Sequence, residues 1–81
     1  ATIPTEISNL VNLEELYLSF NKIVLIPIEI NKLINLKKLD LYKNQIEFIS
    51  TEIGDLVKLK ELNLGYNQIK LMPKDIGNLL E

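Results

Sequence analysis

The chain contains no cysteine, histidine, tryptophan or arginine. Without cysteine there is no disulfide framework and no thiolate metal site, and without histidine there is no imidazole catalysis and no histidine-ligated metal. Without arginine, the side chain that most often makes bidentate contacts to phosphate and guanine is missing, so nucleic acid is not an expected partner. The three glycines are isolated and form no phosphate-binding loop. We therefore expect no enzyme, no cofactor and no metal.

Long apolar runs and a strong net charge are missing too. No run approaches the roughly 20 residues of a membrane span, so no membrane insertion is expected. The 81 residues are 47% hydrophobic and 25% charged with a net charge of −2, which is the composition of one globular domain. The compartment stays open, because a chain without cysteine suits the cytoplasm and equally a secreted or surface location. The first residue is Ala1 and not Met, which is consistent with cleavage or trimming upstream.

What the chain does have is an internal repeat. The pattern LxxLxLxxNxI begins at residues 13, 36 and 59, a period of 23. A single domain over 1–81 is expected to hold a half-repeat and three repeats. Their ranges are 1–12, 13–35, 36–58 and 59–81. In each repeat leucines first alternate with polar residues, which predicts a short strand, and a strand with a helical turn at every period is typical of a solenoid.

The second part of each repeat predicts the helical turn. Ile26, Ile30 and Leu33 follow the spacing i, i+4, i+7, which is one face of a helix. Pro27 stands where the turn begins, a position that tolerates a missing N–H. In the next repeat Ser50 takes that place, and we expect its hydroxyl to cap the turn.

The full pattern LxxLxLxxNxIxxIPxEIxxLxNL resembles the 23-residue leucine-rich repeat, in the LPxxI subtype known from intracellular Ras-binding-type repeats and from bacterial, notably spirochaetal, proteins. The resemblance covers the whole chain. It implies an α/β fold, a right-handed solenoid of about 3.5 repeats, with a short parallel sheet on the concave face and short helical turns on the convex side. It also implies a recognition scaffold with a protein partner. Heavy use of isoleucine, lysine and asparagine favours a bacterial source.

One asparagine recurs at the same position of every repeat: Asn21, Asn44 and Asn67. The chain must turn away from the strand there, which leaves backbone groups without strand partners. An inward carboxamide both donates and accepts, so it can satisfy those groups. We favour this structural role over ligand or metal binding.

The side chains between the strand leucines point outward and form columns across a parallel sheet. The column Glu15, Lys38, Glu61 alternates in charge, and cross-strand pairing is favoured there over ligand recognition. Four of the five aromatic side chains fall on or beside this face, where exposed aromatics favour binding. The residues expected to bind the partner are Tyr17, Phe20, Lys38, Asp40, Tyr42, Lys43, Asn63 and Tyr66.

Two alternatives stay open on this face. Partial burial is the alternative for Phe20, and an inert surface is the alternative for the tyrosines. Gly65 is expected to leave a gap beside Tyr42 that a partner side chain could fill.

A second surface is the apolar position on the loop that leads to the helical turn of each repeat. It either forms an exposed ridge or adds a second row to the core. The exposed solenoid ends also predict self-association, or a natural chain that continues further. The residues expected to self-associate are Leu25, Phe48, Leu71, Leu79 and Leu80. A protein-binding module is the first functional prediction; a self-assembling structural unit and a regulatory fragment of a larger protein are the alternatives.

Overall fold

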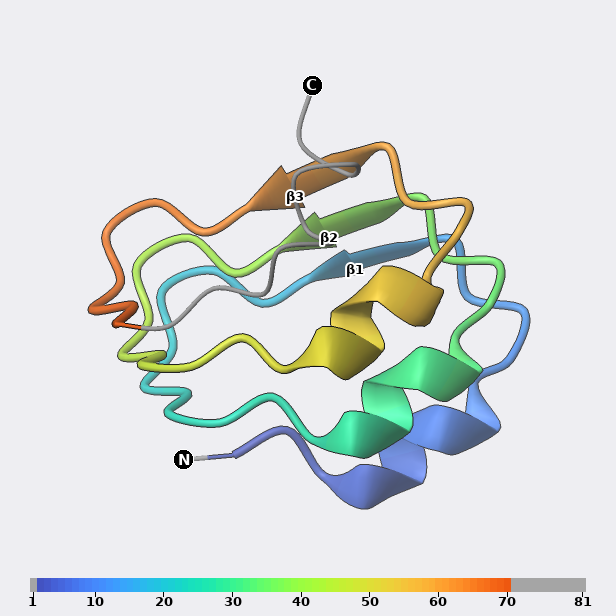
Figure 1. Ribbon diagram of the computed structural model, residues 1–81, viewed down its shortest axis with the longest axis horizontal. Coiled ribbons are helices and arrows are strands. Elements are labelled where there is room, and N and C mark those ends of the chain that lie inside the picture. The colour runs from blue at the N-terminus through green and yellow to red at the C-terminus, as the bar shows by residue number, and fades with distance from the viewer. Residues whose placement is uncertain (1, 71–81) are drawn as a thin grey trace.

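The computed structural model describes residues 2–70. In this part of the chain 3₁₀ helices and short strands alternate (Figure 1). Each helix and each strand begins 23 residues after the previous one of its kind, so the sequence period is also the spacing of the elements. The elements are η1 (Thr5–Asn9), β1 (Glu15–Tyr17), η2 (Ile28–Lys32), β2 (Lys38–Asp40), η3 (Thr51–Asp55) and β3 (Glu61–Asn63).

The strands form an open parallel sheet in the order β1-β2-β3. Leu16 pairs with Leu39, and Leu39 pairs with Leu62, so residues 23 positions apart are direct neighbours. Backbone hydrogen bonds continue beyond the strands: the Leu18 N–H donates to the Asp40 carbonyl at 2.8 Å. The repeat period therefore sets the register of the sheet.

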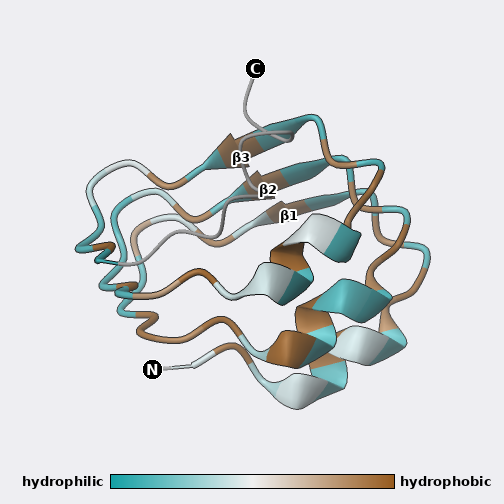
Figure 2. Ribbon diagram, viewed as in Figure 1, coloured by the Kyte–Doolittle hydropathy of each residue, from teal (hydrophilic) through white to brown (hydrophobic). Residues whose placement is uncertain are grey.

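The core lies between the sheet and the row of helices on its other side (Figures 1 and 2). Leu39 is buried at the centre of this layer, whereas Leu16 and Leu62, at the same position in the outer strands, are only partly buried. The largest fully buried side chains are Ile30, Leu33, Leu36, Leu39, Leu41, Ile46, Ile53 and Leu56. Each full turn of the chain thus contributes equivalent side chains to one continuous core.

The helices are shorter and tighter than the apolar spacing predicts. In η2 the Ile30 N–H donates to the Pro27 carbonyl and the Leu33 N–H to the Ile30 carbonyl, both at 3.1 Å, which is the i→i+3 pattern of a 3₁₀ helix. Of the three residues assigned to one helical face, only Ile30 lies inside η2; Ile26 precedes it and Leu33 follows it. All three side chains still face the core, although only one of them belongs to the helix.

The predicted hydroxyl cap in the third helix is wrong. Ser50 precedes η3 with an extended backbone, but its side chain makes no capping hydrogen bond. Pro27 holds the same place before η2 with the same extended backbone. Both helices therefore begin after an extended residue that makes no side-chain capping hydrogen bond.

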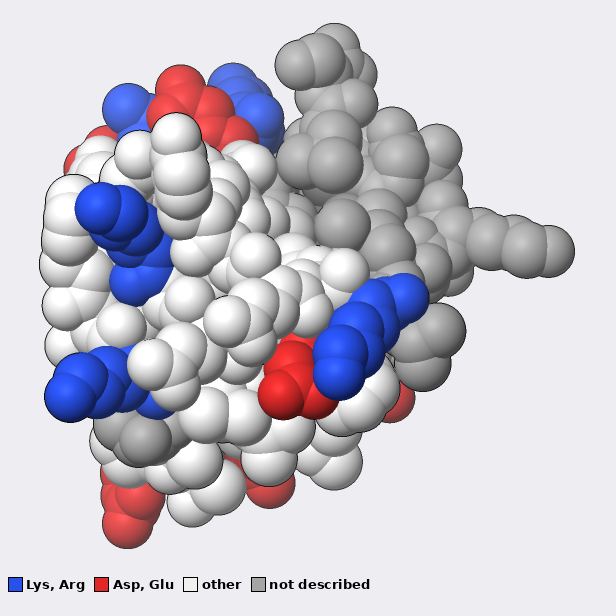
Figure 3. All heavy atoms as spheres, turned by 90° about the vertical axis from the view of Figure 1, so that its left-hand side faces the viewer, with Lys and Arg blue, Asp and Glu red and all other residues white. Residues whose placement is uncertain are grey.

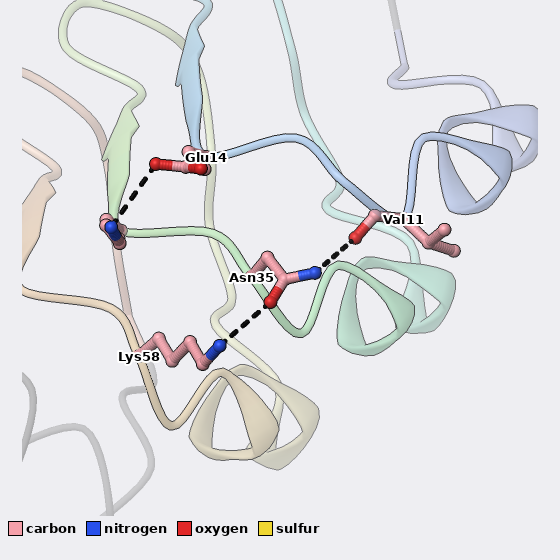
Figure 4. Close-up of polar contacts among 5 residues, drawn as sticks. Val11, Glu14, Asn35 and Lys58 are labelled. Carbon is pink, nitrogen blue, oxygen red and sulfur yellow. Dashed lines mark hydrogen bonds and ion pairs between the residues drawn. The ribbon is translucent and has the colours of Figure 1, made fainter.

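Polar side chains link successive turns where the chain leads into the strands (Figure 4). The Asn35 amide donates to the Val11 carbonyl oxygen and its oxygen accepts from the Lys58 ammonium, both at 2.9 Å. Lys37 forms an ion pair with Glu14 at 3.2 Å. These contacts are exposed, so each stabilises the stack only slightly. Within residues 2–70, no helix has the length and apolar character needed to cross a bilayer.

Candidate functional site

Asn44 is buried, with 6% of its surface exposed, at the point where the chain leaves β2. Its amide nitrogen donates to the carbonyl oxygens of Leu18 and Leu41, both at 3.0 Å. Its oxygen accepts the Ile23 N–H at 3.1 Å. Leu18 and Ile23 belong to the preceding repeat, so this one carboxamide joins two turns of the solenoid.

Asn67 repeats this arrangement one turn later, donating to the Leu41 carbonyl at 2.9 Å and accepting the Ile46 N–H at 3.0 Å. Asn21 is exposed and bonds only within its own turn, to the carbonyl oxygens of Leu18 and Ser19. Every carboxamide of this row thus donates hydrogen bonds to backbone carbonyl oxygens. This geometry supports a structural role for Asn44 and Asn67, whose carboxamides both donate to and accept from the backbone.

The outward side chains of β1–β3 form a surface that we call the sheet face: Glu15, Tyr17, Lys38, Asp40, Glu61 and Asn63. The register places Glu15, Lys38 and Glu61 in one row and Tyr17, Asp40 and Asn63 in the next. Lys38 lies 3.9 Å from the Glu61 carboxylate, but Glu15 accepts a hydrogen bond from the Tyr17 hydroxyl at 2.9 Å. A depression of about 100 Å³ lies between the two rows.

The sheet face favours the neutral form of Tyr17. The hydrogen bond to Glu15 raises the pKa of the Tyr17 hydroxyl above its ordinary value of 10.0, and the negative charges of Glu15, Glu61 and Asp40 act in the same direction. A raised pKa in the folded state means that this contribution to stability is complete below the unfolded value and is lost as pH rises through the folded value. At neutral pH Tyr17 therefore presents a hydroxyl and an exposed ring.

Two residues predicted to bind the partner already accept hydrogen bonds from the backbone of their own repeat. The Asp40 carboxylate accepts the Tyr42 N–H, and the Asn63 carboxamide oxygen accepts the Gly65 N–H, both at 3.0 Å. Asp and Asn commonly close such turns two residues on. The sequence positions of Asp40 and Asn63, each two residues before the N–H that it accepts, could have indicated this structural role. The prediction that both residues contact the partner did not take it into account.

Directly after the strands, Phe20, Tyr42, Lys43 and Tyr66 form a second surface, the exit cluster. Tyr42 meets Phe20 edge-to-face with ring centroids 5.7 Å apart, and meets Tyr66 in the same way at 5.3 Å. The Lys43 ammonium lies 5.4 Å from the Phe20 centroid and 5.8 Å from that of Tyr66. Such contacts are favourable edge-to-face and cation–π geometries, so side chains from three repeats form one connected group.

The backbone of the exit cluster is left-handed at Phe20, Lys43 and Tyr66, with φ of 59°, 58° and 53°. Each such residue costs on the order of 1 kcal/mol when it is not glycine. Neighbouring turns hold this conformation: the Phe20 N–H donates to the Tyr42 carbonyl and the Lys43 N–H to the Gly65 carbonyl, both at 2.9 Å. The same backbone turn in every repeat therefore presents these three side chains in one row.

The expected gap above Gly65 is absent. A Cβ at Gly65 would lie 3.0 Å from Cδ1 of Tyr42, so the Tyr42 ring itself fills this space. The small residue lets Tyr42 lean across the next repeat and reach Tyr66. Gly65 therefore serves the exit cluster and leaves no room for a partner side chain.

The apolar position that precedes η2 and η3 is at the surface. Leu25 and Phe48 are 50% and 46% exposed, while the next residue in each repeat points toward the core. They form an exposed ridge and not a second core row; Leu71, Leu79 and Leu80 lie outside the described residues. A groove of about 380 Å³ lies beside Leu25. An additional exposed apolar row, Val11, Ile34 and Val57, also has the 23-residue period and was not predicted.

The structure thus places the predicted partner-binding residues on two adjoining surfaces, the sheet face and the exit cluster. In residues 2–70 no group of three or more acidic side chains converges as metal ligands would. The Asp55 carboxylate accepts a hydrogen bond from the Asn31 amide at 3.2 Å.

Comparison with known proteins identifies the repeat. The leucine rich repeat family matches residues 11–69. No curated protein matches the chain. Among solved structures, a leucine-rich-repeat protein of Leptospira interrogans is 46% identical with a TM-score of 0.91, over 96% of this chain and 20% of that one.

Two further structures are similar over 96% of this chain. The plant peptide hormone receptor RGFR1, in complex with RGF2, is 44% identical with a TM-score of 0.83 and is covered over 13% of its length. An internalin of Listeria monocytogenes is 35% identical with a TM-score of 0.81 and is covered over 22%. The chain thus spans 22% or less of these three relatives. Leucine-rich-repeat domains generally mediate protein–protein interaction, and this chain belongs to the leucine-rich-repeat family.

Proposed function

We propose that the chain is a protein-recognition module that binds its partner through the sheet face, as the concave side of the solenoid, together with the exit cluster. The observation that carries this proposal is the exposure of Tyr17, Phe20 and Tyr66, at 58%, 69% and 72%. Exposed aromatic rings supply rigid contact area with little loss of side-chain entropy, and such residues dominate binding hot spots.

A division of roles within the repeat supports the proposal. The leucines fill the core and the asparagine row satisfies the turning backbone, so the outward rings of Tyr17 and Tyr66 take no part in the core. Among the similar structures, the receptor RGFR1 is in complex with RGF2, which agrees with a protein partner. Because the relatives are much longer than this chain, the alternative of a regulatory segment of a larger protein also stands as a proposal.

The double substitution Phe20→Ala/Tyr66→Ala tests the proposal. We expect capture of the partner from a lysate of the source organism, measured by quantitative mass spectrometry, to fall at least tenfold. Two aromatic hot-spot residues at about 1–2 kcal/mol each give such a loss. The melting temperature should fall modestly, because the rings are exposed but the change also removes their edge-to-face contacts with Tyr42, so capture is measured at a temperature where both chains are folded.

Phe48→Ala is the matched control, since it removes a half-exposed aromatic ring from the ridge. Capture should be unchanged in this variant. If Phe48→Ala lost the partner and the double variant kept it, the ridge would be the binding surface and the proposal would be wrong.

A further inference from the structure

Resting on the proposed function, we propose that Lys43 recognises an acidic side chain of the partner. The partner segment presents an Asp or Glu carboxylate to the Lys43 ammonium and apolar side chains to the Phe20 and Tyr66 rings on either side. The exit cluster is thereby assigned a partner chemistry: an extended peptide segment in which apolar residues flank a carboxylate.

Lys43 is a positioned charge with unused hydrogen-bond donors. Its ammonium lies within about 6 Å of both ring centroids, at 5.4 and 5.8 Å, which is the range of cation–π attraction. The rings restrain the ammonium, and among residues 2–70 no atom accepts a hydrogen bond from its three N–H groups. Among residues 2–70 the ion pairs that involve carboxylates use Lys37, Lys38 and Lys70, and Lys43 is in none of them.

The charge around Lys43 favours an anionic partner. The loops that follow the strands, residues 18–24, 41–47 and 64–70, carry three lysines and one carboxylate, Glu47. Glu47 is paired with Lys70 at 3.5 Å. This side of a chain with net charge −2 is therefore locally positive. Figure 3 shows this face, where lysines are separated by uncharged side chains and a carboxylate in the middle of the view lies beside a lysine.

The spacing of the exit cluster fits an extended segment. Neighbouring parallel strands lie about 4.8 Å apart, so Phe20 and Tyr66, two repeats apart, are separated by roughly 10 Å. A segment in polyproline II geometry rises about 3.1 Å per residue with three residues per turn, so residues i and i+3 point to the same side and span this distance. A carboxylate at i+1 or i+2 lies between them along the chain, where its side chain can turn toward Lys43. A single ammonium with no arginine nearby suits one carboxylate better than a phosphorylated chain.

A peptide selection tests this inference. A library of random 12-residue peptides displayed on phage is selected on the immobilised wild-type chain, and the enriched peptides are then synthesised and their dissociation constants measured. We expect the enriched peptides to share an Asp or Glu between apolar residues three positions apart. Their affinity should fall about fivefold for Lys43→Gln, the factor of an exposed charge pair of about 1 kcal/mol, and Lys43→Arg should retain most of it.

Lys60→Gln is the matched control, since it removes an exposed lysine that precedes β3, at the other end of the strands. It should change the affinity less than twofold. Replacing the peptide's acidic residue with its amide should cost about fivefold on the wild type and nothing further on Lys43→Gln, because both changes remove the same pair.

Enriched peptides without an acidic preference, a loss as large for Lys60→Gln as for Lys43→Gln, or additive losses in the double change would each overturn the inference. So would a selection that yields no peptide dependent on Lys43. Peptides that lack the acidic preference but still require Phe20 and Tyr66 would leave the proposed function standing. Peptides that bind Phe20→Ala/Tyr66→Ala unchanged would count against both.

Discussion

Asn44→Ala is expected to remove more than half of the free energy of unfolding. The substitution leaves the buried Ile23 N–H without an acceptor and removes the bonds to the Leu18 and Leu41 carbonyl oxygens. An unsatisfied buried donor costs about 1–3 kcal/mol and each lost bond about 1 kcal/mol more, so we expect a loss of roughly 3 kcal/mol. A domain of this size has a free energy of unfolding near the lower end of about 5–15 kcal/mol.

The measurement is the urea midpoint followed by circular dichroism, and Asn21→Ala is its control. Asn21 holds the same position in its repeat but is exposed, and its two hydrogen bonds stay within its own turn. The Leu18 carbonyl keeps its bond from Asn44 in that variant. A loss below about 1 kcal/mol is expected. Equal midpoints for the two variants would contradict the role of the asparagine row in joining repeats.

Leu39→Ala is the second change with a large expected effect. Leu39 lies in β2, buried between the sheet and the helices, and has a neighbouring strand on each side. Truncating a buried leucine costs about 2–5 kcal/mol, because the lost burial and the remaining cavity add. We expect about 3 kcal/mol in the same urea titration.

Leu16→Ala provides the comparison, because Leu16 has the same place in β1 but is only partly buried. Its loss should be about half that of Leu39→Ala, since less apolar area leaves water on folding. Similar losses would mean that the central strand is not the more tightly packed one. A smaller loss for Leu39→Ala than for Leu16→Ala would contradict the described core directly.

The strand register of the sheet could be predicted residue by residue because it follows from the 23-residue repeat period alone. Once the period is 23, residue 17 must lie beside residue 40, and the structure pairs Tyr17 with Asp40. The same number brings Asn44 to the turn of the preceding repeat, where it bonds Leu18 and Ile23. The strand register and the columns of outward side chains could therefore be predicted from the sequence.

The local backbone conformation could not be predicted from the repeat period. The spacing of Ile26, Ile30 and Leu33 suits a helix and equally a bend around the core, and only the hydrogen bonds of η2 distinguish the two. Nothing in the residue types of Phe20 or Lys43 indicates a positive φ, which is imposed by the neighbouring turns.

The exit cluster depends on contacts between repeats. The sequence places Tyr42 and Gly65 in one column, but it does not say that the ring leans over the glycine. That choice depends on the side-chain conformation of Tyr42 and on the Asp40 and Asn63 turns beneath it. An empty gap was predicted from the small size of Gly65, without the possibility that the Tyr42 ring extends over it.

Hydroxyl-radical footprinting of the chain with its captured partner is the most direct test of the proposed binding surface. Oxidation of Tyr17, Phe20 and Tyr66 is read by mass spectrometry with and without the partner, and Phe48 serves as the internal reference because it is also exposed. We predict that the partner lowers the oxidation rate of the three rings severalfold and leaves that of Phe48 unchanged. Protection of Phe48 with no change at Tyr17, Phe20 and Tyr66 would contradict recognition through the sheet face and the exit cluster.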